Sequence, residues 1–252
     1  MKKISSCGRH VIAVLFLLFM AFPLGCGDDE TAAPDTSVHF KDPNLEAAVR
    51  DAIGKPTGPI YPTDLNELDE LSAPGQPGKF ISDLGGIEYC TNLSDLSLEG
   101  NSIYSIDPLR GLIKLDILKL ADNIIEDITP LEALLDLDVL ELQGNHIRDI
   151  AALKNLIELG TLKLGRNYVG AAAAVGEEPL VLAPLGDLTE LSSLDLGDNL
   201  IRDVYGLVLN SDNGGLGSGD SVTLVNNPLS PYAIEAQIEY YLKTIKQVAV
   251  TY

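Results

Sequence analysis

Asparagine recurs in this chain at a fixed spacing, and that spacing limits the folds the chain can adopt. Four asparagines lie 22 residues apart, and two more follow after 32 and 28 residues. The six residues are Asn101, Asn123, Asn145, Asn167, Asn199 and Asn227. A period of this length indicates stacked supersecondary units, because one such unit cannot bury its apolar side alone.

Aliphatic residues flank each asparagine at constant offsets. A spaced pair such as Leu140 and Leu142 precedes it, and an aliphatic such as Ile147 follows two residues later. The unit reads L-x-x-L-x-L-x-x-N-x-I/L, which is the leucine-rich-repeat pattern. Its alternation predicts one short strand per repeat, with the leucines facing inward. The predicted fold class is α/β: a right-handed leucine-rich-repeat solenoid with a curved parallel sheet, and with 3₁₀ turns or loops on its convex side.

The repeated asparagine stands where the chain leaves each strand. Its amide can both donate to and accept from backbone groups that the turn leaves unpaired, so we expect a structural asparagine ladder. In the degenerate first repeat, Cys90 occupies the position of Leu112, Leu134 and Leu156. We therefore expect Cys90 to be a small buried apolar residue rather than a reactive thiol.

Both ends of a solenoid expose apolar core and need caps. Asp42-Pro43 predicts the start of a helix that runs to Gly54. Its buried face would hold Leu45, Ala48, Val49 and Ile53. Ser230-Pro231 carries the same start signal and predicts a second helix, followed by a strand over 248–252. The buried stripe of that second helix would hold Ile234, Ile238, Tyr241 and Ile245.

The predicted organisation follows from these caps. An N-terminal helical cap covers 38–67, the repeats cover 68–229, and a C-terminal cap covers 230–252. Two departures from the period predict insertions near 170–180 and 210–219. The second is rich in glycine but lacks the Lys-Ser/Thr end of a phosphate loop. Asp212 and Asp220 match no EF-hand spacing, so we expect neither a cofactor nor a metal.

The first 25 residues read as a secretory signal peptide. A basic start, an apolar run over 11–22 and Gly25 before the cut fit that pattern, and the run is too short to span a bilayer. The ending Leu24-Gly25-Cys26 resembles a bacterial lipoprotein signal, although Pro23 departs from the usual aliphatic residue. This resemblance implies lipidation of Cys26, and ordinary cleavage with a free Cys26 is the alternative. Residues 26–37 would then form a flexible acidic tether.

The formal net charge is −20, from 17 basic and 37 acidic residues. Loss of Lys2, Lys3 and Arg9 with the signal peptide would leave 14 basic residues, a net charge of −23. Such a charge repels phosphate backbones and anionic lipid surfaces, so we expect no nucleic-acid partner. Membrane contact would come through the lipid on Cys26 alone. We expect an exported, monomeric protein anchored in the outer membrane or at the cell surface, or alternatively a secreted one.

The solvent-facing strand positions can be aligned column by column. In the first column Ile117 lies beside Val139, and in the second Lys119 and Lys163 flank Glu141. Exposed aliphatics beside cations are unusual on an acidic surface, and they predict the centre of contact with a partner. The alternative is an ordinary cross-strand ladder of opposite charges with two incidental aliphatics.

Catalysis has little support in the residues. His39 and His146 lie in different parts of the predicted solenoid, and neither has a nucleophile beside it in the sequence, so we expect no enzyme activity. Three functions compete: a recognition module for another protein or a glycan, a periplasmic structural or assembly lipoprotein, and an enzyme inhibitor. The first is the prediction, with the partner on the concave face.

Longer segments resemble a known family. The opening VHFKDPNLEAAVRDAIGKPTGPI, the 22-residue repeats and the ending GLGSGDSVTLVNNPLS are similar to those of internalin-like bacterial leucine-rich-repeat proteins. The resemblance covers about 38–252. It implies a secreted or surface-attached protein that binds proteins or glycans on the concave sheet. The insertions and the expanded first repeat depart from the regular pattern.

Overall fold

A computed structural model describes residues 36–171 and 181–252 of the chain. The predicted signal peptide, Cys26 and most of the predicted tether lie outside these residues, as does most of the predicted insertion near 170–180. Within the described ranges, no helix has both the length and the apolar character needed to cross a membrane.

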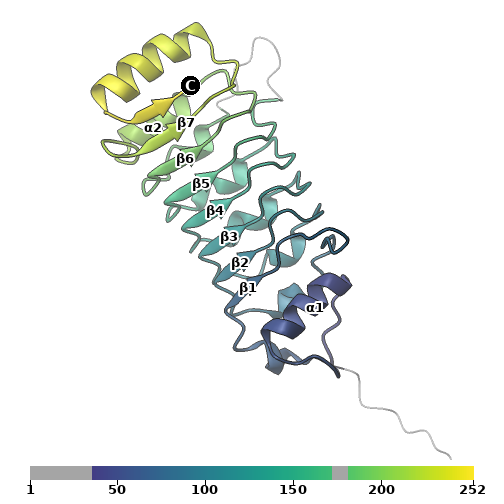
Figure 1. Ribbon diagram of the computed structural model, residues 1–252. Helices are drawn as coiled ribbons and strands as arrows, with labels where there is room; N and C mark the ends of the chain where they lie inside the picture. Colours follow the sequence, from purple (N-terminus) through teal and green to yellow (C-terminus); the bar gives the residue numbers. More distant parts are fainter. Residues whose placement is uncertain (1–35, 172–180) are drawn as a thin grey trace, which may run out of the picture. The chain divides into compact units, whose positions relative to one another are not determined.

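Eight three-residue strands form one parallel sheet in chain order (Figure 1). They are β1 (Glu70–Ser72), β2 (Asp95–Ser97), β3 (Ile117–Lys119), β4 (Val139–Glu141), β5 (Thr161–Lys163), β6 (Ser193–Asp195), β7 (Ser221–Thr223) and β8 (Ala249–Thr251). The central residue of each strand points into the core, as the alternation predicts. The predicted leucine-rich-repeat solenoid is therefore confirmed.

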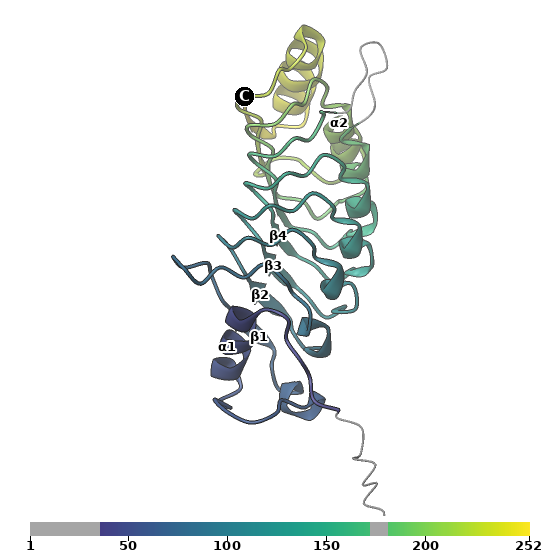
Figure 2. The same ribbon diagram turned by 90° about the vertical axis from the view of Figure 1, so that its right-hand side faces the viewer.

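Short helices return the chain from each strand to the next. Five of them are 3₁₀ helices, as predicted: η2 (Ile87–Tyr89), η3 (Asp107–Leu109), η4 (Thr129–Ala133), η5 (Ala151–Asn155) and η6 (Ala183–Leu185). They lie one above another along one side in Figure 2. The return from β6 to β7 is longer and forms α2 (Tyr205–Asp212), so the predicted insertion near 210–219 begins inside a helix.

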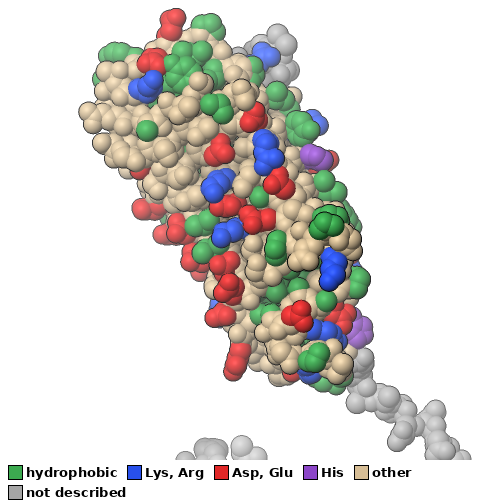
Figure 3. Space-filling model, viewed as in Figure 1, with side chains coloured by type: hydrophobic (Ala, Val, Ile, Leu, Met, Phe, Trp, Pro, Cys, Tyr) green, Lys and Arg blue, Asp and Glu red, His purple; other side chains and the backbone are tan. Residues whose placement is uncertain are grey.

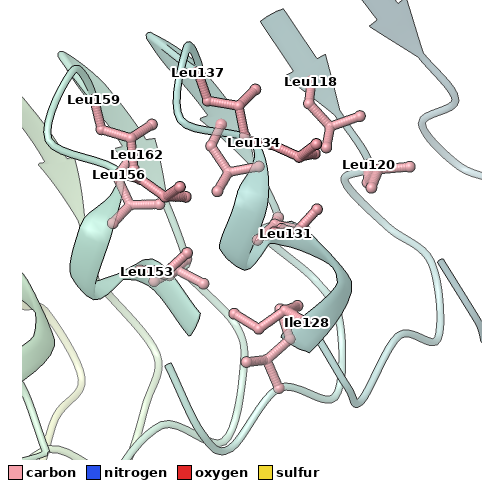
Figure 4. Packing of buried hydrophobic residues seen from close by; sticks show 14 of the residues in the cluster. Leu118, Leu120, Ile128, Leu131, Leu134, Leu137, Leu153, Leu156, Leu159 and Leu162 are labelled. Carbon is pink, nitrogen blue, oxygen red and sulfur yellow. The ribbon is translucent and has the colours of Figure 1, made fainter. Parts of the chain in front are cut away.

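The core consists of equivalent aliphatic residues stacked repeat upon repeat. Figure 4 shows Leu131, Leu134 and Leu137 of one repeat beside Leu153, Leu156 and Leu159 of the next. All six are fully buried. Cys90 fills the equivalent position in the first repeat and is also fully buried. Burial, assisted by the nearby Glu88 carboxylate, raises the pKa of the Cys90 thiol to about 12, which keeps it in its unreactive protonated form.

The asparagine ladder is present at all six positions. Asn145 represents the set: its Oδ1 accepts from the Ile125 N–H at 3.0 Å. Its Nδ2 donates to the Leu120 carbonyl at 2.9 Å and the Leu142 carbonyl at 3.0 Å. Each amide thus joins its own repeat to the preceding one, and it satisfies backbone groups that have no water to bond.

The N-terminal cap forms as its signals predict. Helix α1 (Pro43–Ala52) has Asp42 as its N-cap and buries Leu45 and Val49. The other Asp42 oxygen accepts from the Ser82 N–H at 2.8 Å, which ties the cap to the first repeat. Burial alone would raise the pKa of the Asp42 carboxyl, but hydrogen bonds from Ser82, Asn44 and Leu45 outweigh it and lower that pKa. A short 3₁₀ helix, η1 (Pro62–Leu65), follows.

The predicted buried face of the C-terminal helix is wrong in part. Helix η7 (Ala233–Ile245) is a π-helix, and it buries Ala233, Gln237, Ile238 and Leu242. Of the predicted stripe only Ile238 is fully buried, and Ile245 is 52% exposed. The prediction used the α-helical period, whereas i→i+5 hydrogen bonds bring residues four to five apart onto one face. The Ser230 hydroxyl accepts from the Ala233 N–H, as the start signal predicts.

Candidate functional site

The five residues predicted to contact a partner lie together on strands β3, β4 and β5. Ile117 pairs in register with Val139, and Lys119 pairs with Glu141. Glu141 in turn pairs with Lys163 on the next strand. All five are partly exposed, because the intervening Leu118, Leu140 and Leu162 point into the core. The predicted columns are therefore present as one continuous patch, which we call the sheet-face patch.

The two lysines of the sheet-face patch differ in their electrostatic surroundings. Lys163 Nζ lies 2.7 Å from Glu141 Oε1, and the Glu141 side chain is only 14% exposed. Within the described part of the chain, Lys119 forms no ion pair. The Glu141 carboxylate thus neutralises Lys163, whereas Lys119 keeps an uncompensated positive charge beside Ile117 and Val139. This asymmetry is not visible in the sequence, where both lysines flank Glu141 equally.

A row of side chains that the sequence analysis did not predict follows the ladder asparagines. The residues after four consecutive ladder asparagines form a row on successive repeats: Ile124, His146, Tyr168 and Leu200. Backbone hydrogen bonds hold them in register, such as Tyr168 N–H to the Ile147 carbonyl at 2.9 Å. The Tyr168 ring lies 5.8 Å from the His146 ring and 5.5 Å from the Arg148 guanidinium. Reading the sequence one residue past each asparagine would have found this row.

The residues considered for catalysis or metal binding lie in different parts of the solenoid. His39 lies in the N-terminal cap with Ser37 Oγ 3.3 Å from its Nδ1, whereas His146 lies in the turn after β4, several repeats away. The Tyr241 hydroxyl donates to Asp212 and Lys246 Nζ lies 3.3 Å from it, and these contacts lower the pKa of the Asp212 carboxyl. Among the described residues no three histidine, cysteine or acidic side chains are grouped as metal ligands would be.

Comparison with solved structures places this geometry among known folds. An internalin, inlF, from Listeria monocytogenes matches with 26% sequence identity and a TM-score of 0.54, over 75% of this chain and 64% of that chain. Internalin C2 from the same organism matches with 29% identity and a TM-score of 0.55, over 84% of this chain and 94% of that one. The fold is internalin-like.

The remaining comparisons add the fold alone. A leucine-rich-repeat protein of Leptospira interrogans matches with 24% identity and a TM-score of 0.54, over 66% of this chain and 39% of that chain. The internalin-like chain thus spans less than two thirds of the inlF and Leptospira chains. No protein-family model and no curated protein sequence matches it.

Proposed function

We propose that the chain is a non-catalytic recognition module that binds another protein through the sheet-face patch. Internalin-like leucine-rich-repeat folds commonly serve as protein-interaction modules, and they are typically non-catalytic. The observation that carries the proposal is the partly exposed Ile117–Val139 pair beside Lys119, which forms no ion pair with another described residue. A partly exposed aliphatic pair with an adjacent cation favours a partner that presents an apolar residue next to a carboxylate.

Reversing the patch charges should remove the partner. We expect the double variant Lys119→Glu/Lys163→Glu to lower recovery of the native partner more than tenfold, because truncated or reversed charge pairs at interfaces cost about 2–5 kcal/mol. The measurement is cross-linking capture from cells of the source organism, with quantitative mass spectrometry. Lys154→Glu is the control, because Lys154 is exposed on η5 away from the strands. Equal recovery by wild type and double variant would end this proposal.

We further propose that the module is exported and held in the bacterial envelope by a lipid on Cys26. Support comes from the sequence Leu24-Gly25-Cys26 after a basic start and a short apolar run. Both competing functions use the lipid anchor. A recognition module would act at the cell surface, whereas an assembly lipoprotein would act in the periplasm.

Substituting Cys26 tests the anchor. We expect Cys26→Ser to move the protein from the membrane fraction to the soluble exported fraction. The apolar run over 11–22 is too short to span a bilayer, so the lipid would be the membrane attachment that this variant loses. Immunoblots of separated fractions give the readout, and Cys90→Ala, a small apolar replacement at a buried position outside the predicted signal, is the control. Unchanged membrane retention of Cys26→Ser would contradict lipidation. Protease treatment of intact cells then separates surface display, with cleavage, from a periplasmic location.

A further inference from the structure

A second apolar feature precedes the strands of the sheet-face patch. Ile113, Leu135 and Ile157 are 58%, 50% and 50% exposed, and they lie 22 residues apart in the chain. Each follows a fully buried core leucine, so the three side chains stand on successive repeats. Single exposed aliphatics are common, but three in register form a continuous apolar surface. We call these three residues the aliphatic stripe.

A hollow of about 640 Å³ lies on neighbouring residues of the same repeats. We call it the acidic hollow, and its lining residues are Asp116, Asp136, Asp138, Glu158, Gly160, Glu190 and Ser192. Backbone hydrogen bonds of 3.0 Å, from Asp138 N–H to the Asp116 carbonyl and from Gly160 N–H to the Asp138 carbonyl, align these three lining residues on successive repeats. The red side chains along the left-hand edge of Figure 3 show carboxylates gathered beside the strands.

The acidic hollow lacks internal charge compensation. Within residues 36–171 and 181–252, none of its five carboxylates forms an ion pair. Lys114 belongs to the same column of the repeat, but its Nζ donates to Asn92 Oδ1 at 2.6 Å instead. The acidic hollow attracts cations locally. The formal net charge of −20 on the whole chain adds a long-range attraction for cations.

We propose that the aliphatic stripe and the acidic hollow together dock a cationic amphipathic helix of a partner protein. Repeats are spaced by the distance between strands, about 4.8 Å. Residues three to four apart on a helix advance about 4.5–6 Å along its axis, so one helix face offers one side chain per repeat. Same-side residues of an extended segment lie about 6.6 Å apart and lose this register. Apolar residues of the helix cover the stripe, and its Lys or Arg side chains reach the hollow.

This surface adjoins the sheet-face patch but shares no residue with it. The patch residues occupy strand positions 117–119, 139–141 and 161–163, whereas the stripe and hollow precede each strand. The two surfaces also select opposite charges, because the patch presents Lys119 and the hollow presents carboxylates. Their tests can therefore fail independently.

The experiment uses the full chain and a synthetic helical peptide of about 14 residues, with Leu on one face and Lys on the other. Binding is followed by fluorescence anisotropy of the labelled peptide. We expect it to bind at least about tenfold more tightly than a peptide of the same composition in scrambled order, because only the ordered peptide buries the aliphatic stripe. Equal binding of the two peptides would overturn the proposal.

Matched variants locate the site. Ile113→Ser/Leu135→Ser/Ile157→Ser should weaken binding about tenfold, because it removes the apolar surface that the peptide covers. These side chains are exposed, so their loss leaves the core intact. Asp116→Asn/Asp136→Asn/Glu158→Gln should weaken it similarly and reduce its salt dependence.

The control Glu67→Gln/Glu126→Gln/Glu235→Gln removes as many exposed charges elsewhere and should change binding less than about twofold. An equal loss in this control would show attraction to net charge alone and refute a local site. Lys119→Glu should not weaken peptide binding, and a loss there would place the peptide on the sheet-face patch instead.

Discussion

Asn145→Ala is expected to destabilise the solenoid by about 3 kcal/mol, a large share of the stability of a single domain. Removal of the amide strands the Ile125 N–H and the Leu120 and Leu142 carbonyls in a region that excludes water. Each buried polar group left unpaired costs about 1–3 kcal/mol, and shared relaxation keeps the total below the sum. Urea unfolding measures the loss, and hydrogen exchange of the Ile125 amide should accelerate.

Two further variants make this result specific. Asn155→Ala removes the same side chain from an exposed position at the end of η5 and should change stability by less than about 0.5 kcal/mol. Asn145→Asp retains the acceptor for Ile125 but loses both donors and introduces a buried charge, so it should be at least as damaging as Asn145→Ala. Unfolding of Asn145→Ala at the wild-type urea concentration would refute the structural role of the ladder.

The sheet and the ladder could be predicted from the sequence because two periods act on the same residues. Alternation within a strand decides which side chains face inward, and the 22-residue period aligns Leu140 with Leu118 and Leu162. Since a slip of one residue would expose all the leucines, the register has no close competitor. The placement of Ile117 beside Val139 follows from the same constraint.

The local charge pairing could not be predicted in this way. Lys119 and Lys163 are equivalent neighbours of Glu141 in the aligned repeats, yet only Lys163 contacts its carboxylate. The choice depends on side-chain rotamers, which the repeat pattern does not specify. The role of Lys119 as the free cation of the sheet-face patch is therefore a result of the structure.

The turn before each ladder asparagine shows a rule that only the backbone reveals. The preceding residue has a positive φ in all six repeats, including 72° at Gly144 and 56° at Arg166. Glycine, aspartate and asparagine suit this left-handed conformation at five of these positions, but arginine does not. Arg166 lies 2.9 Å from Asp122 of a repeat two strands away, and the absent side chain of Gly144 leaves space for that ion pair. The ion pair with Asp122 thus accompanies an arginine in a backbone conformation that arginine does not favour.

Gly206→Ala separates local preference from packing most sharply. Alanine inside helix α2 should stabilise it by about 1 kcal/mol on helix propensity alone. A Cβ at this position, however, would overlap the Leu182 carbonyl group and lie 2.7 Å from the Leu182 Cβ. Because the clash is with backbone, α2 must move away from the preceding repeat and open the core between them. We therefore expect a net loss of about 2 kcal/mol, the opposite sign to the propensity argument.

The matched substitution for this test is Gly111→Ala. An added Cβ at Gly111 meets no atom within 4 Å, and this glycine does not have a positive φ. Alanine there should leave stability unchanged or raise it by up to about 1 kcal/mol, because it restricts the unfolded chain. The urea midpoint of Gly206→Ala should therefore fall below that of wild type, whereas that of Gly111→Ala should not. A rise in stability for Gly206→Ala would mean that α2 does not pack against the preceding repeat as closely as the Leu182 contact requires.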